Sequence, residues 1–200
     1  MTTYAFPAVT PSKSTLELVS NTRSFVSPLT NAIQTTNRKG SYWKISMEFK
    51  NLTGADRATM QAFIASLNGM EHRFSVQDHS FTSMRGAGGG TLLVNGAGQT
   101  GSTLNADGAT ASTTNYLRPG DYISFNNELH MVTTDASSNG SGEVSIVIAP
   151  PIRKPTNDND VIDYSIPVSG IFILTSPAGW DNRPGGFSTL NIEGIEDVLA

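Results

Sequence analysis

Residues 42–50 read Tyr-Trp-Lys-Ile-Ser-Met-Glu-Phe-Lys, and this stretch decides the fold class. Every second side chain in it is large and apolar: Trp43, Ile45, Met47 and Phe49. The side chains between them are mostly polar or charged. Because successive side chains of a strand point to opposite faces, this period of two predicts one buried face and one solvated face. We therefore expect a half-buried strand in an antiparallel sheet.

The segment after this strand predicts the one convincing helix, over residues 53–69. An apolar stripe has the i, i+3, i+4, i+7 spacing of a single helix face: Met60, Phe63, Ile64 and Leu67. Thr53 is a good N-cap, and Asp56 three residues later makes a short-acid variant of the capping box. Gly69 is placed to end the helix as its C′ residue. A strand at Arg73–Gln77 follows, so the helix should cover part of a sheet.

A segment with different composition interrupts this pattern. Glycines crowd residues 85–90 at its start, and prolines crowd residues 150–155 at its end. Tyr122–Phe125 and Glu128–Val132 predict a hairpin whose two-residue turn is Asn126-Asn127, the residue type that type I′ turns prefer. Glu143–Ala149 predicts a further strand, and weaker strand signals lie at Thr91–Val94 and near Leu104. Short strands without a helix suggest a small barrel of OB-like size.

Strand signals resume after Pro155, which makes the middle segment an insertion. They lie at Val161–Val168, at Ile171–Thr175 after a turn at Ser169-Gly170, and at Phe187–Ile192. We expect residues 1–83 and 155–200 to form one β-sandwich-like domain with helix 53–69, and residues 84–154 to form an inserted OB-like β-barrel domain. In a linear two-domain interpretation, residues 155–200 would be too short to bury a core alone. The expected fold class is mainly β with one α-helix.

Composition narrows the function classes. The 200-residue chain has a net charge of −4 and no cysteine, which removes disulfides, thiolate metal sites and cysteine nucleophiles. A negative chain argues against nucleic-acid recognition, because phosphate neutralisation needs a basic surface. The charge is uneven, since residues 1–83 sum to +3 and residues 155–200 to −6. These two parts could meet within one fold or across subunits.

We expect neither a signal peptide nor membrane insertion. The N-terminus has no basic region followed by an apolar region. The longest apolar run, around Gly170 to Leu174, is too short to cross a bilayer. The expectation is a soluble protein made in the cytoplasm.

The motifs that could carry chemistry lack the context that the chemistry needs. Gly96 to Gly101 match GxGxxG, but residues 102–108 cannot begin the helix that would hold a pyrophosphate, so a glycine-rich turn is the better interpretation. Three histidines lack the spacing of a zinc site: His72, His79 and His130. Residues 157–160, Asn-Asp-Asn-Asp, lack the glycine and glutamate of a calcium loop. We therefore predict no catalytic residues, no cofactor, no metal ligands and no enzymatic activity.

Aromatic side chains of the middle segment leave one binding function open. Tyr116, Tyr122 and Phe125 could stack on bases or sugars if an OB-like face exposed them. Residues 84–154 hold only four basic residues, which disfavours nucleic acid. A carbohydrate contact through Tyr116 or Tyr122 remains an alternative to core packing or a subunit contact.

Several blocks of the sequence resemble distal tail proteins of long-tailed temperate phages and prophages. They are Ser20–Thr30 with the strand and helix after it, Val94–Gly101, Leu117–Tyr122 through His130–Thr133, and Ile148–Arg153. These blocks touch most of the chain, but they are turn and strand patterns rather than catalytic motifs. No catalytic residue carries over from the family.

The resemblance implies a β-sandwich-like domain with an inserted OB-like or galectin-like domain. It also implies a structural virion protein: a homo-oligomeric ring, typically six-fold, that joins the tail tube protein to the hub proteins of the tail tip. The expected location is the phage tail, after synthesis in the host cytoplasm. Because a closed ring joins different faces of neighbouring subunits, we hypothesise that the basic segment 1–83 meets the acidic segment 155–200 of the adjacent subunit.

Other functions compete with this one. A carbohydrate-binding tail module for host-surface attachment is the alternative from another class, and a tail-tip cell-wall hydrolase is the enzymatic one. Within the structural class, a tail tube or tube-completion subunit is the rival. The inserted domain favours the distal tail role.

Overall fold

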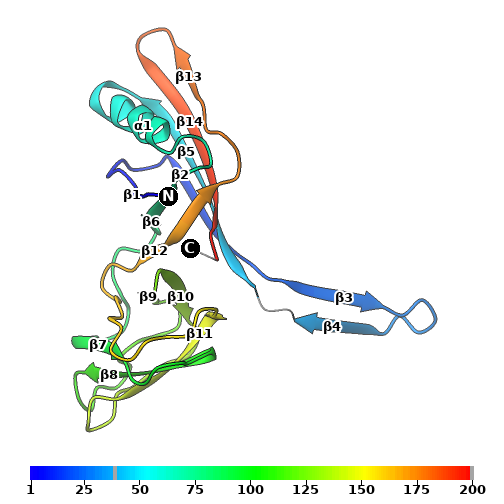
Figure 1. Ribbon diagram of the computed structural model, residues 1–200, viewed down its shortest axis with the longest axis vertical. Coiled ribbons are helices and arrows are strands. Elements are labelled where there is room, and N and C mark those ends of the chain that lie inside the picture. The colour runs from blue at the N-terminus through cyan, green and yellow to red at the C-terminus, as the bar shows by residue number, and fades with distance from the viewer. Residues whose placement is uncertain (38–39, 199–200) are drawn as a thin grey trace.

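The computed structural model describes residues 1–37 and 40–198 of the chain. The protein is mainly β with one helix, so the expected fold class is confirmed. Figure 1 shows three parts: a large sheet with the helix on it, a smaller β body below, and a two-stranded arm that projects to one side.

The large sheet is built from both ends of the chain. Its strands run in the order β1 (Thr3–Ala5), β6 (Arg73–Gln77), β12 (Val168–Leu174), β14 (Phe187–Glu196), β5 (Tyr42–Leu52) and β2 (Lys13–Val19), with β13 (Trp180–Arg183) beside β14. The pairings are antiparallel except that of β1 with β6. The alternating stretch at 42–50 lies in β5, and its four apolar side chains are at most 3% exposed. The prediction of a half-buried strand is confirmed.

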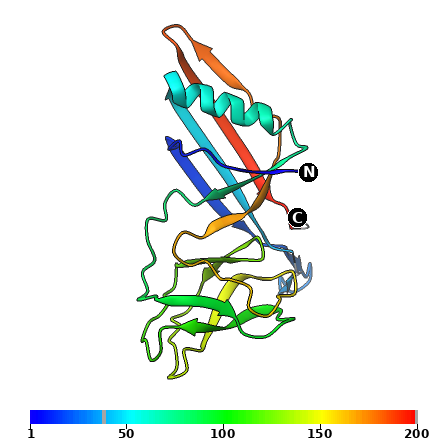
Figure 2. The ribbon, with the colours of Figure 1, turned by 60° about the vertical axis from the view of Figure 1, so that its left-hand side comes forward.

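Helix α1 (Gly54–Ser66) covers the buried face of this sheet (Figure 2). Its apolar stripe is buried against the strands, as the helical spacing predicted. Thr53 precedes the first turn, but its side chain makes no capping hydrogen bond, so the expected capping box with Asp56 is not formed. The helix ends at Ser66 and Leu67 is its C-cap, so the C′ residue is Asn68, with a left-handed φ of 49°, and not Gly69 as expected.

The smaller body is a five-stranded antiparallel sheet with a core of its own. Its strands run in the order β7 (Gly90–Val94), β8 (Gly101–Ala109), β11 (Val144–Ile152), β10 (Glu128–Val132) and β9 (Tyr122–Phe125). Strands β9 and β10 have the predicted bounds. Asn126 and Asn127 join them with φ angles of 51° and 62°, the positive values that a type I′ turn requires.

Residues 155–167, which we name the return segment, close the five-stranded sheet into a small barrel. The two edge strands of that sheet are β7 and β9. Val161 bridges to β7, and Asp163 bridges to β9. Ile162 between them is 2% exposed and belongs to the barrel core. Contacts with the barrel thus continue past residue 154, the boundary that the sequence suggested.

The strand predicted at Val161–Val168 is wrong. Isolated bridges form there instead, because neighbouring residues pair with two different edge strands. The side chain of Asp163 then accepts hydrogen bonds from backbone N–H groups of the turn that follows it. The turn predicted at Ser169-Gly170 is also wrong, since both residues lie within β12. The two bodies approach each other closely at Gly170. A Cβ at this position would lie 2.8 Å from the carbonyl oxygen of Asn127, so the absence of a side chain allows the approach.

The arm, residues 20–37, is a hairpin of β3 (Thr22–Val26) and β4 (Ile33–Asn37). Among the described residues these strands pair with each other and with no other strand. Strand β3 follows β2 along the chain, β4 precedes β5, and β2 pairs with β5. The arm is therefore an outward extension of the β2–β5 hairpin, which Figure 1 shows in blue at the right. The sequence pattern did not predict it.

Candidate functional site

The arm carries four exposed, large apolar side chains. Phe25 and Val26 on β3 are 58% and 57% exposed, and Ile33 on β4 is 67% exposed. Leu29, in the turn, is 93% exposed. A lone two-stranded hairpin is marginally stable in water, and clustered exposed apolar side chains mark interaction sites. The arm therefore has the properties of an element that docks on another surface.

Backbone hydrogen bonds order the tip of the arm. The N–H of Ser27 donates to the carbonyl of Ala32 at 2.9 Å, and the N–H of Asn31 donates to the carbonyl of Ser27 at 2.9 Å. Asn31 has a φ of 55°, a conformation that asparagine tolerates better than most residues. A tip that is already ordered loses less conformational entropy when it docks.

The return segment is a second surface that combines charge with exposed apolar side chains. It contains Asp158, Asp160 and Asp163 and no basic residue. Val161 and Ile166 are 64% and 61% exposed. Hydrogen bonds from backbone N–H groups hold the three carboxylates in place. This strip of the barrel surface is therefore acidic, apolar and ordered.

The barrel and the large sheet share one core at the joint between them. Tyr122 and Leu129 belong to barrel strands, but they are buried among the apolar side chains of the large sheet. The ring of Trp43 on β5 packs edge-on against Tyr122, with ring centroids 6.0 Å apart. Its Nε1 donates to the carbonyl of Leu129 at 2.8 Å. The two bodies are therefore packed together rather than only tethered by linkers.

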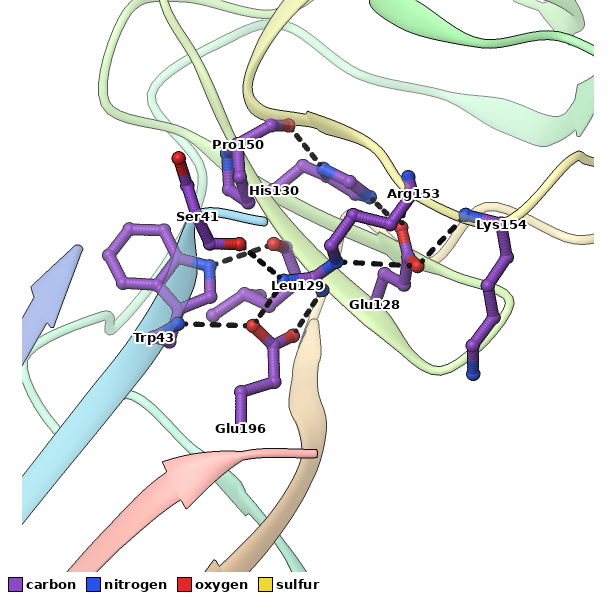
Figure 3. A network of polar contacts seen from close by, with 9 residues as sticks. All are labelled: Ser41, Trp43, Glu128, Leu129, His130, Pro150, Arg153, Lys154 and Glu196. Carbon is purple, nitrogen blue, oxygen red and sulfur yellow. Dashed lines mark hydrogen bonds and ion pairs between the residues drawn. The ribbon is translucent and has the colours of Figure 1, made fainter. Parts of the chain in front are cut away.

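Arg153, at the end of the barrel, bonds to both bodies (Figure 3). Its Nη1 and Nη2 each lie 2.7 Å from an oxygen of Glu196 on β14. Nη1 also donates to the carbonyl of Ser41 at 2.9 Å, and Nε lies 3.4 Å from Glu128 on β10. The side chains of Arg153, Glu196 and Glu128 are only 10%, 1% and 2% exposed. We name Arg153, Glu196, Glu128 and His130 the joint cluster.

Further contacts complete the joint cluster. The N–H of Trp43 donates to Glu196 at 3.1 Å, and the N–H of Arg153 donates to Glu128 at 3.2 Å. Nδ1 of His130 lies 2.8 Å from the carbonyl of Pro150, so it must carry a hydrogen, because a carbonyl only accepts. Nε2 of the same ring lies 3.4 Å from the carboxylate of Glu128.

The contacts within the joint cluster favour the charged forms of Glu128 and Arg153. Burial by itself would raise the pKa of Glu128, but the adjacent ring of His130 and the charge of Arg153 outweigh burial and lower this pKa. Burial would likewise lower the pKa of Arg153, but the carboxylates of Glu196 and Glu128 raise it. Because these groups are paired and enclosed, the arrangement holds two bodies together and does not present an acid or base to a substrate.

The GxGxxG match forms a turn. Residues 96–101 join β7 to β8, and a strand follows them where a nucleotide site would need a helix. The side chain of Gln99 donates to the carbonyl of Asn105 and accepts from its N–H, at 2.9 and 2.7 Å. The N–H of Gly98 donates to the carbonyl of Thr156 at 2.7 Å. These contacts agree with the glycine-rich-turn interpretation.

The remaining polar candidates also contact other residues of the fold. His72 and His79 lie on either side of β6, where each faces an aromatic ring of the N-terminal segment. Burial lowers the pKa of His79, and the charge of Asp78 opposes this shift. Residues 157–160 form a turn in which the carboxylate of Asp160 accepts a backbone hydrogen bond at 2.9 Å. Within 1–37 and 40–198, no group of three or more His, Cys, Asp or Glu could hold a metal ion.

The three aromatic candidates are buried. Tyr116, Tyr122 and Phe125 are 0%, 9% and 3% exposed. The hydroxyl of Tyr116 donates to the carbonyl of Gly89 at 2.8 Å. Burial, together with the neighbouring Asp78, raises the pKa of Tyr122 to about 12. These rings pack the two cores and do not form a stacking platform on the surface.

The sequence did contain signals for the features that it failed to predict. Glu196 stands in phase with Leu190 and Ile192, so it is an acid at a core position, which requires a buried partner. Phe25 and Ile33 are large apolar residues in a polar stretch without helix or strand periodicity. Such a pattern predicts no buried face, so these side chains are expected to be exposed.

Comparison with known proteins gives no identification. No protein-family model matches the chain, and no curated protein matches it. Among the described residues, no helix is long and apolar enough to cross a membrane.

Proposed function

We propose that this chain is a non-enzymatic structural subunit that assembles into a ring in the tail tip of a long-tailed phage, where it connects the tail tube to the hub. The arm is the observation that carries the assembly part of this proposal. Its exposed apolar side chains extend beyond both cores of the subunit, where no other described strand covers them. A second copy of the chain is the occupant that we propose for them.

The joint supports the same proposal through rigidity. A ring closes only if each subunit presents its two contact faces at a fixed angle. The shared core around Trp43 and the bidentate pair of Arg153 with Glu196 hold the barrel and the large sheet in one relative position. A subunit with a loosely tethered barrel would lose this fixed geometry.

The tail-tip location, the six-fold symmetry, and the tube and hub partners rest on the sequence resemblance described above. The inserted barrel favours the distal tail over a tail tube or tube-completion subunit, which is the rival within the structural class. The carbohydrate-binding alternative gains no support, because Tyr116 and Tyr122 are buried. The proposal assigns the chain no cofactor, no metal ion, and no catalytic residue.

Electron microscopy of the purified chain tests this proposal. Closed rings of uniform size, with a central opening, are the expected result. Isolated particles of single-chain size at every protein concentration would refute ring assembly. The position of the gene separates the two structural roles, because a distal tail gene is expected to follow the tape-measure gene.

A further inference from the structure

We propose that the arm of one copy docks on the return segment of the next copy. This inference rests on the proposed ring and names the surfaces that would form its interface. A ring built from identical subunits needs two different, complementary surfaces on opposite sides of each subunit. The arm supplies one surface, and the return segment has the properties required of the other.

The two surfaces lie on opposite sides of the molecule. Figure 1 shows the arm leaving the body at the right, whereas β7 and β9 lie at the left. The return segment bridges these two strands through Val161 and Asp163, so it lies on the side away from the arm. A contact between them is therefore out of reach within this subunit and available between neighbours.

Both surfaces contain exposed apolar side chains. Among the described side chains outside the arm, the most exposed large apolar ones after Met1 are Val161 and Ile166, at 64% and 61%. They match in character the exposed Val26 and Ile33 of the arm, which lie opposite each other on one face of the hairpin. Contact between the two sets would remove apolar surface from water on both partners, which is the main favourable term in association.

Charge makes the match specific. In the sequence, residues 20–40 contain three basic residues and no acidic one, and the basic residue among those that the structure describes is Arg23 on β3. The return segment contains three aspartates and no basic residue. The net charges are opposite, +1 over arm residues 20–37 and −3 over the return segment, and this favours encounter of the two surfaces.

The return segment is a rigid receptor for a docking arm. Ile162 anchors it in the barrel core at 2% exposure. The N–H of Val94 donates to the carbonyl of Asp160 at 2.9 Å, and the N–H of Ser124 donates to the carbonyl of Asp163 at 2.8 Å. A surface held in this way loses little conformational freedom on binding.

Another exposed apolar pair fits the arm less well. Trp180 and Phe187, at the β13–β14 hairpin, are 39% and 42% exposed. Between Trp180 and Phe187 the charges of Asp181 and Arg183 cancel, so this end of the hairpin has no net charge to complement the arm. This hairpin supplies a matched control position.

Cysteine cross-linking tests the docking directly, because the natural chain contains no cysteine. Chains with Ile33→Cys and chains with Val161→Cys, of which one carries a tag, are mixed and treated with a short bismaleimide. We expect a covalent dimer of the two different chains. The control mixture, Ile33→Cys with Phe187→Cys, should not form one.

The outcomes separate this inference from the proposed ring. Rings that form without the Val161→Cys cross-link, or with the control cross-link instead, would overturn the docking surface and leave the ring standing. A dominant dimer between two Ile33→Cys chains would show that arms meet arms, which also overturns it. If the unmodified chain forms no ring, the proposed function itself fails.

Discussion

Arg153 and Glu196 form a bidentate ion pair across the joint, with both nitrogen–oxygen distances at 2.7 Å and side-chain exposures of 10% and 1%. Arg153 ends the barrel, and Glu196 stands on β14 of the large sheet. Two planar groups paired in this way fix orientation as well as distance. The relative position of the two bodies therefore depends on a buried charge pair as well as on apolar packing.

Removal of the arginine should destabilise the protein strongly. In Arg153→Met, the buried carboxylates of Glu196 and Glu128 lose their cation, and loss of one partner of a buried pair costs about 3–5 kcal/mol. Urea denaturation measures the free energy of unfolding. The control is Lys50→Met, which breaks the exposed pair with Glu48 and should cost less than about 1 kcal/mol. Equal losses in the two variants would contradict a structural role for the joint cluster.

Gly170→Ala should disturb the same joint by adding an atom where the two bodies are in close contact. A Cβ at this position would lie 2.5 Å from a carboxylate oxygen of Glu196 and 2.8 Å from the carbonyl of Asn127, so one of them must move. Overpacking of this kind costs about 1–3 kcal/mol. Gly179→Ala is the matched control, because a Cβ there meets nothing within 4 Å. Equal thermal midpoints for the two variants would show that the bodies do not approach closely at Gly170.

Acid should weaken the fold through Glu128. A carboxyl whose pKa is lower in the folded chain than in the unfolded chain stabilises the fold above its ordinary value, and this contribution is lost as the pH falls through the folded pKa. The ordinary value is 4.5, and the folded value lies below it. We expect the unfolding free energy to fall as the pH is lowered below 4.5, and to fall less in Glu128→Gln. The exposed Glu17→Gln should keep the wild-type slope; a wild-type slope in Glu128→Gln as well would exclude this role.

The return segment should contribute to the stability of the barrel. Ile162→Ala removes a side chain that is 2% exposed, and a buried truncation of this size costs about 2–5 kcal/mol. The adjacent Val161→Ala, at a position that is 64% exposed, should change stability by less than about 0.5 kcal/mol. Denaturation curves of the two variants make the comparison. If both were neutral, the barrel would not depend on residues after 154.

Local periodicity explains what the sequence predicted well. The alternation in residues 42–50 and the stripe in α1 place side chains on one face, so the pattern itself determines burial. The Asn126-Asn127 turn was also predictable, because both residues tolerate the positive φ of a tight hairpin. The helix cap was predicted less well. Thr53 is a residue type common at N-caps and occupies the N-cap position, but its side chain makes no capping hydrogen bond.

The joint and the arm depend on contacts that local pattern does not contain. Arg153 and Glu196 are 43 residues apart in the chain, and their pairing exists only after both bodies fold. The return segment resembles a strand in composition, but its residues divide their bonds between two barrel edges. Among the described residues, β3 and β4 pair with no strand outside the arm and their large apolar side chains enter neither core, so no core selects a periodic pattern for them.

Native mass measurement of wild type and an arm variant tests self-assembly through the arm most directly. Phe25→Ser with Ile33→Ser replaces exposed side chains only, so the subunit should still fold, and Phe187→Ser is the control outside the arm. We predict a closed multiple of the 21.3 kDa chain for the wild type and the control, and a 21.3 kDa monomer for the arm variant. A wild type that stays monomeric, or an arm variant that assembles as the wild type does, would contradict the account.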